Sequence, residues 1–105
     1  MKILITGAAS AKAYQLKNSL NVDEILLGDY ADLPILMLKA GNMVKLPNPA
    51  DASYSHKMLA FCLDNQVDTV YALGMDEWKL LNEAVQLFKE YGITIYMQYN
   101  EIYRH

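Results

Sequence analysis

Residues able to bind a nucleotide gather after a short apolar run near the start of the chain. The run "KILIT" leads into Gly7-Ala8-Ala9-Ser10, a turn after which a helix can present its first amides to a phosphate. Asp29 follows Gly7 by 22 residues, close to the spacing of about 20 at which an acid binds a ribose hydroxyl in such folds. Gly74 ends a later apolar run and is expected at the same edge of a sheet. The candidate cofactor-binding residues are therefore Gly7, Ala8, Ala9, Ser10, Asp29 and Gly74.

The same turn departs from the glycine pattern of dinucleotide-binding loops. That pattern is G-x-G-x-x-G, and here Ala9 and Lys12 stand at the second and third glycine positions. The methyl group of Ala9 occupies the place where a backbone must approach a phosphate. The nearby charges also disfavour an anion, because Asp29, Asp32, Asp76 and Glu77 stand against Lys12 alone. Two interpretations remain open, a structural turn and a nucleotide site.

The other reactive side chains form no catalytic or metal-binding pattern. His56 and His105 lie 49 residues apart with no cysteine or carboxylate at ligand spacing, so we predict no metal site and a solvated His56. Cys62 falls within the apolar run "MLAFCL" and is predicted to be a buried, unreactive thiol. Asp76 and Glu77 are adjacent acids, which the dipole of a helix favours in its first turn. No nucleophile and base can be placed together, so we predict no catalytic residue.

Composition restricts the classes of partner. The chain has 105 residues and a net charge of −3, with scattered lysines and arginines, which argues against nucleic acid. No apolar stretch approaches the roughly 18 residues needed to cross a bilayer, and "MKILITG" has no signal-peptide cleavage site. A single cysteine suits a reducing compartment. We expect one domain over residues 1–105 and a cytoplasmic protein that binds neither membrane nor nucleic acid.

Alternating strand and helix patterns predict an α/β fold. Strands are expected at residues 2–6, 24–29, 43–47, 68–73 and 93–97. Helices are expected at residues 10–20 with Ser10 as N-cap, at 53–66 with Leu63 partly inward, and less clearly within 31–42. Right-handed crossovers then give a three-layer, Rossmann-like, doubly wound parallel sheet of about five strands in the order 3-2-1-4-5.

The clearest helix lies between Asp76, its predicted N-cap, and Gly92, its predicted left-handed C-terminal cap. Its apolar face is predicted from the spacing of Trp78, Leu81, Val85 and Phe88.

Two family resemblances bear on function. "TGAAS" resembles the opening of short-chain dehydrogenases, but Ala11 and Ala13 occupy the later glycine positions of their loop. Those enzymes use a Tyr-x-x-x-Lys pair, whereas Tyr54 and Lys57 are only three residues apart. This match covers about ten residues, and we do not adopt it as the function.

The second resemblance covers roughly 95 residues. "MKILITGAAS", "VDEILLGDY", "MVKLPNPADASYSHKMLAFCLDNQVDTVYALGMDEWKLL" and "YGITIY" together resemble the PreATP-grasp domain, the small Rossmann-like domain that precedes an ATP-grasp domain in proteins like the carbamoyl-phosphate synthase large subunit. In that family the domain packs against the ATP-grasp fold and borders the substrate site, while ATP and magnesium are held by the domain that follows. The sequence ends at His105, so we expect it to lack the ATP-binding machinery of that following domain. Three alternatives stay open: a degenerate stand-alone remnant, a separate subunit that completes a partner, and one domain of a longer protein.

The resemblance implies a domain that is not an ATP-dependent ligase on its own. The first hypothesis is therefore a non-catalytic interaction domain, either a homo-oligomer or an accessory subunit of an ATP-grasp enzyme. Its contact segments would be "LPILML" at 33–38 and the tyrosines Tyr96, Tyr99 and Tyr103. Another interpretation of "LPILML" is that it simply covers the sheet, and both interpretations of this segment remain open. The alternative is a protein that binds a small nucleotide, NAD(P) or a nucleotide sugar through Gly7 to Ser10, with Asp29 on the ribose. A complete small enzyme is the weakest hypothesis, and no cofactor is assigned.

Overall fold

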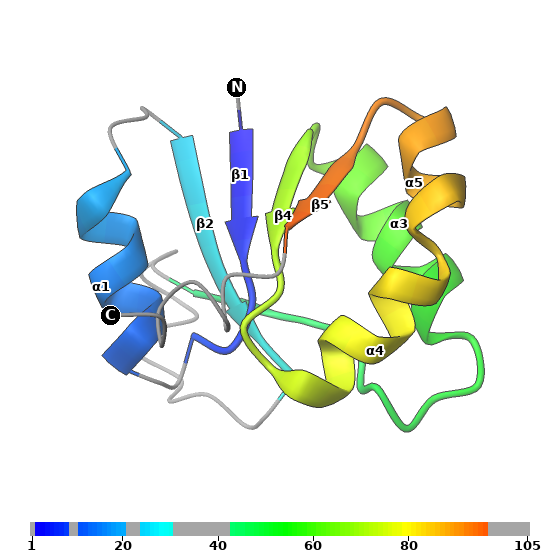
Figure 1. Cartoon of the computed structure of the whole chain (residues 1–105), viewed down its shortest axis with the longest axis horizontal. Coiled ribbons are helices and arrows are strands. Elements are labelled where there is room, and N and C mark those ends of the chain that lie inside the picture. The colour runs from blue at the N-terminus through cyan, green and yellow to red at the C-terminus, as the bar shows by residue number, and fades with distance from the viewer. Residues whose placement is uncertain (1, 9–10, 21–23, 31–42, 97–105) are drawn as a thin grey trace.

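Five parallel strands form one sheet at the centre of the molecule (Figure 1). The computed structural model describes residues 2–8, 11–20, 24–30 and 43–96. The strands are β1 (Lys2–Ile5), β2 (Glu24–Asp29), β3 (Val44–Lys45), β4 (Thr69–Tyr71) and β5 (Thr94–Tyr96). Their spatial order is β3-β2-β1-β4-β5, and every neighbouring pair is parallel. The predicted doubly wound order 3-2-1-4-5 is confirmed.

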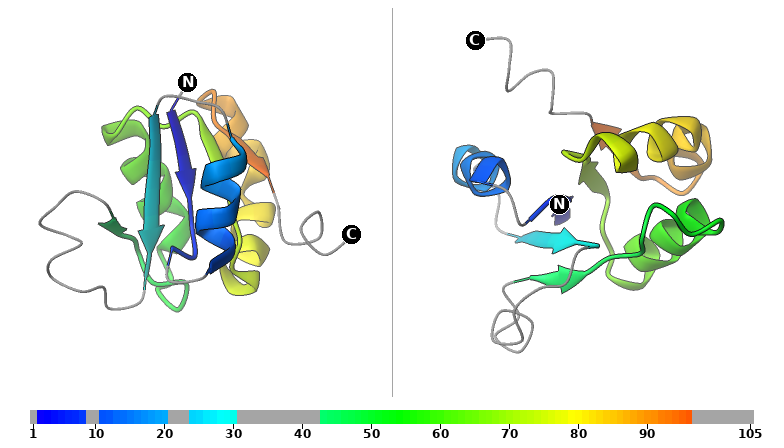
Figure 2. Two further views of the ribbon diagram at one scale, coloured as in Figure 1. Left: turned by 90° about the vertical axis from the view of Figure 1, so that its left-hand side faces the viewer. Right: turned by 90° about the horizontal axis from the view of Figure 1, so that it is seen from below.

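Helices cover both faces of this sheet and complete the three layers. Helix α1 (Ala11–Ser19) lies on one face, and α3 (Tyr54–Asp64), α4 (Met75–Glu83) and α5 (Val85–Glu90) lie on the other (Figure 2). None of these described helices has the length and apolar character needed to cross a membrane.

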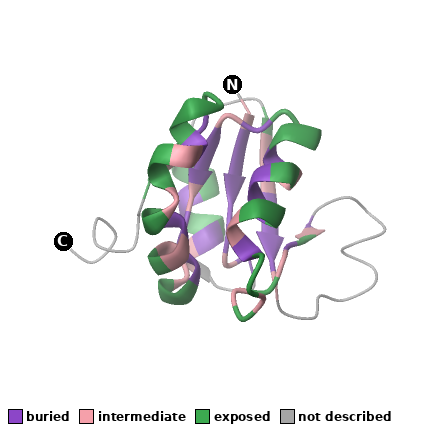
Figure 3. Cartoon of the chain, turned by 90° about the vertical axis from the view of Figure 1, so that its right-hand side faces the viewer, coloured by how far each residue is buried: buried purple, intermediate pink, exposed green. Residues whose placement is uncertain are grey.

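The alternation of side chains along β1 produces two hydrophobic cores. Ile3 and Ile5 pack in one core with Ala13 and Leu16 of α1. Leu4 points the other way, into a larger core built with α3, α4 and α5. Ile3, Leu4 and Ile5 are all buried, because the strand is covered on both faces (Figure 3).

The region from Met75 to Glu90 differs from the continuous helix that the sequence predicted. The helix breaks at Ala84, whose amide donates to the Leu81 carbonyl, and α5 begins at Val85. Val85 is exposed rather than part of the apolar face. The N-cap is Gly74 and not Asp76, which lies in the first turn. Gly92 has φ +78, as expected of a left-handed cap.

The exposure of Leu63 and the length of β3 also differ from what the sequence predicted. Cys62 is buried, as predicted, but Leu63 is 45% exposed and does not face the core. The expected strand 43–47 is shorter and spans only β3. The N-cap role of Ser10, the segment 31–42 and the aromatic residues Tyr99 and Tyr103 lie outside the described residues.

Candidate functional site

The polar residues that the sequence singled out meet at the carboxyl edge of the sheet. Thr6 follows β1, Asp29 ends β2, and α4 begins immediately beyond β4. Because β1 and β4 are neighbours whose connections run to opposite sides, this edge is the switch point where α/β proteins commonly bind ligands. Figure 1 shows the start of α4 at the same end of the sheet as the last residue of β1.

The turn after β1 is tied to the neighbouring strand. Gly7 adopts φ +68, a conformation that glycine reaches without strain. The amide of Ala8 then donates a hydrogen bond to the carbonyl of Gly28, at 3.0 Å. The side chain of Ala8 is fully buried in the core beneath α1. The amide of Ala8 is therefore already engaged in a backbone hydrogen bond to strand β2. Ala9 lies outside the described residues.

Asp29 is not an open surface acid. It is only 5% exposed, and its charge acts on the carboxyl of Glu77, whose pKa it raises. The backbone carbonyl of Asp29 accepts a hydrogen bond from the amide of Leu46, at 2.9 Å. Contact between Asp29 and a ribose stays a prediction, but the structure adds a second acid beside it.

Asp76 and Glu77, the adjacent acids in the first turn of α4, differ sharply in solvent exposure. Asp76 is exposed, whereas Glu77 has no exposed surface at all. The hydroxyl of Tyr54 donates to Oε2 of Glu77, at 3.2 Å. Its Oε1 atom has no hydrogen-bond partner among the described residues. Oε1 lies so near Gly74 that a Cβ atom there would stand 2.9 Å away.

Burial shifts the pKa values of the Glu77 carboxyl and of the Tyr54 phenol that donates to it. It raises the pKa of Glu77 to about 7. The hydroxyls of Tyr54 and Thr6 partly offset this rise in pKa, whereas the charges of Asp29 and Asp76 add to it. Burial and the nearby Glu77 also raise the pKa of the Tyr54 phenol, so Tyr54 remains a neutral donor. The hydroxyl of Thr6 accepts a hydrogen bond from the amide of Leu73, at 3.1 Å. Glu77 is thus a buried carboxyl that gains or loses its proton near neutral pH.

A groove of about 440 Å³ lies on the outer side of α4. One wall is the exposed face of that helix, and the other is the segment between β3 and α3 together with Tyr30. Its lining residues are Tyr30, Asn48, Pro49, Ala50, Asp76, Lys79, Leu80 and Glu83.

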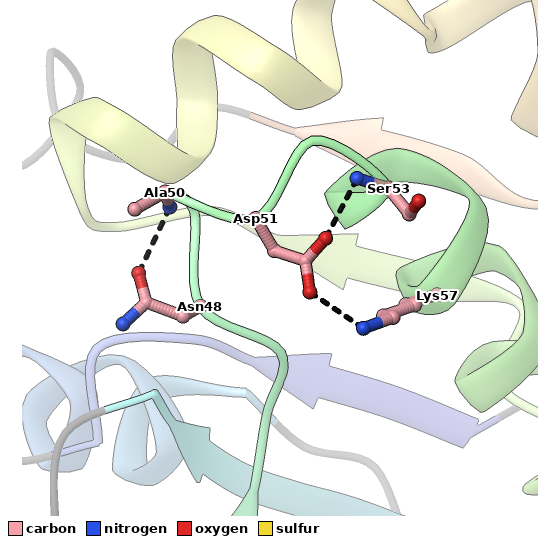
Figure 4. A network of polar contacts seen from close by, with 5 residues as sticks. All are labelled: Asn48, Ala50, Asp51, Ser53 and Lys57. Carbon is pink, nitrogen blue, oxygen red and sulfur yellow. Dashed lines mark hydrogen bonds and ion pairs between the residues drawn. The ribbon is translucent and has the colours of Figure 1, made fainter.

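Hydrogen bonds fix the segment that forms the second wall (Figure 4). Asn48 accepts a bond from the amide of Ala50 through Oδ1, at 2.8 Å. Asp51 accepts one from the amide of Ser53, at 2.8 Å, and forms an ion pair with Lys57. The bond from Lys57 is the main reason why the pKa of Asp51 lies below its ordinary value. The wall therefore has a defined shape before any ligand arrives.

Two of these features were missed by reasoning from the sequence. The burial of Glu77 had a signal, since it precedes the buried Leu81 by four residues and so shares the inward face of α4. Asp76, Lys79 and Glu83 also recur at helical spacing. Nothing local, however, showed that the segment from β3 to α3 would lie opposite them.

No model of a known protein family matches this chain, and a search of curated proteins finds no match either. Its function must therefore be argued from the fold and from the geometry of the carboxyl edge.

Proposed function

We propose that this chain is a PreATP-grasp-like accessory domain that acts without catalysis, through contacts with a second copy or with an ATP-grasp partner. The observation that carries the proposal is the hydrogen bond from the Ala8 amide to the Gly28 carbonyl. A loop that cradles a pyrophosphate presents its amides to the ligand. Here the amide of Ala8 instead ties the turn after β1 to β2.

The surroundings of that bond support a structural role for the turn. A Cβ atom at Gly28 would lie 2.7 Å from the side chain of Leu46, so the backbone here is packed too closely to admit a larger residue. Two acids at this edge of the sheet, Asp29 and Glu77, are both buried. A phosphate at this turn would meet their negative potential without the glycines that favour its approach.

Exposed aromatic surface supports the contact function. The ring of Tyr96 on β5 stacks on that of Tyr71 on β4, with centroids 5.2 Å apart, and Tyr96 remains 45% exposed. Tyr91 and Met75 also expose much of their side chains. Aromatic residues and methionine are enriched where proteins bind one another.

Thermal unfolding with ATP, NAD, NADP and nucleotide sugars tests the proposal against its alternative, a nucleotide site at Gly7 to Ser10. A ligand present at about 100 times its dissociation constant adds roughly 2.7 kcal/mol to the free energy of unfolding. In a domain of this size, that would raise the midpoint by on the order of 10 °C. We expect no such shift with any of them, and a shift would contradict the accessory role.

Light scattering after size exclusion separates the two kinds of partner. A mass of about twice the 11.9 kDa of the chain would support self-association. A mass of 11.9 kDa would remove that form of the proposal and leave the ATP-grasp partner.

A further inference from the structure

Three charged side chains of α4 line the groove on the outer face of that helix. Asp76, Lys79 and Glu83 are exposed and follow one another at spacings of three and four residues, so they share one face of the helix. None of them makes a hydrogen bond or an ion pair with another residue in the described part of the chain. Within that part of the chain, the groove is the feature that these three charged residues share.

The opposite wall contains an aromatic residue, Tyr30, and a side-chain amide, Asn48. Pro49, an apolar residue, also lines the groove on this side. The Oδ1 atom of Asn48 is occupied by the amide of Ala50, which leaves the Nδ2 group to donate to a ligand. Asp51 holds this segment in place through Ser53 and Lys57 (Figure 4).

The pattern of charge selects the class of ligand. Two carboxylates and one ammonium leave one net negative charge, which disfavours phosphates and other anions. A complementary ligand carries two cationic groups and one carboxylate. Its body must also be long, because Asp76 and Glu83 lie about 10 Å apart along the helix axis.

We propose that the groove binds a basic amino acid such as arginine. The α-carboxylate would meet Lys79 and the Nδ2 group of Asn48, and the two cationic groups would meet Asp76 and Glu83. The guanidinium plane would pack on the ring of Tyr30, as arginine does on aromatic faces. The volume of about 440 Å³ falls within the range of ligand pockets, roughly 300–1,000 Å³. This inference does not rest on the accessory role proposed above, because the groove and the Ala8 turn are separate features.

Titration of the ¹⁵N-labelled chain with L-arginine, followed by amide chemical shifts, tests this inference. We expect saturable shifts confined to residue 30, residues 48–50 and residues 76–83, with half-saturation below about 10 mM. Citrulline has no side-chain charge and should bind at least about 10-fold more weakly, because one carboxylate loses its partner. Agmatine has no carboxylate and should bind about 5-fold more weakly, since Lys79 then faces no anion.

Variants at exposed positions separate this groove from general attraction to an acidic protein. Glu83→Gln should weaken arginine binding about 5-fold to 10-fold. The matched control is Glu90→Gln, which removes the same charge from an exposed site on α5 that does not line the groove, and it should leave binding unchanged. Equal weakening by both variants would overturn the proposal, as would equal affinity for citrulline or the absence of saturation. Both side chains are exposed, so folding should survive either change.

Discussion

The two faces of α4 place adjacent acids in opposite environments. Glu77 points inward, where Tyr54 donates to one carboxyl oxygen and the other has no partner among the described residues. Asp76 points outward into the groove with Lys79 and Glu83. A step of one residue turns a helix by about 100°, which is enough to move a carboxylate from water into a core. The inner acid therefore affects stability, while the outer charges lie exposed at the groove.

The inner face should give the molecule its largest pH dependence. Glu77 has an ordinary pKa of 4.5, and burial raises it to about 7 in the folded state. Between these values the folded chain binds a proton that the unfolded chain has released. The free energy of unfolding should therefore fall as pH rises from about 4.5 to 7, by on the order of 3 kcal/mol, and then level off. Urea unfolding at pH 5, 6, 7 and 8 measures this slope.

Glu77→Gln is the control for that slope. Glutamine is neutral at every pH and can still accept the bond from Tyr54, so the decline between pH 4.5 and 7 should disappear whatever the absolute stability. Asp51 does not confuse the measurement, because its pKa lies below its ordinary 3.8 and its contribution is lost only in more acidic solution. A slope that persists in Glu77→Gln would show that another group titrates in its place.

The sequence predicted the fold well because each strand carries its own signal. β1, β2 and β4 are short apolar runs that end in glycine or polar residues, and a parallel order follows from the helices between them. The break at Ala84 could not be predicted, since both halves continue a helical pattern and the last turn of α4 tightens only in the folded chain. Propensity alone does not place such a boundary.

The candidate site was predicted less completely than the fold, because its contacts join residues that are far apart in the sequence. The Gly7 turn has a sequence pattern, but whether its amides are free depends on Gly28, a residue of another strand. The neighbours of Glu77 come from positions 6, 29 and 54, and only the folded chain brings them together. Burial of a charge is a tertiary property, and a helical pattern shows only which face the charge shares.

Removal of the hydroxyl that supports Glu77 should have the next largest effect. Tyr54→Phe keeps the buried ring but takes the hydrogen bond from Oε2. At pH 8, where Glu77 is mostly ionised, the loss should be about 1–3 kcal/mol in the free energy of unfolding. At pH 5 it should be smaller, because a protonated carboxyl needs the donor less. Urea unfolding at both pH values measures this difference.

A double-mutant cycle with Glu77→Gln sharpens this expectation. If Tyr54 acts through the charge of Glu77, Tyr54→Phe should cost less at pH 8 in the Glu77→Gln background than in the natural chain. An equal cost in both backgrounds would mean that the hydroxyl stabilises the fold independently of the carboxylate.

The smallest effect is expected on the outer face, one residue away. Asp76→Asn should change the free energy of unfolding by no more than about 0.5 kcal/mol, because Asp76 is exposed and its side chain makes no hydrogen bond or ion pair with the described residues. Two small effects on the free energy of unfolding oppose each other. Losing an acid from the first turn of the helix lowers it, while removing a charge that raises the pKa of Glu77 increases it. The pH dependence of unfolding should therefore remain, with its upper end moved slightly toward acid. If Asp76→Asn instead removed the slope, the outer acid would belong to the buried network, and the division of α4 into two faces would fail.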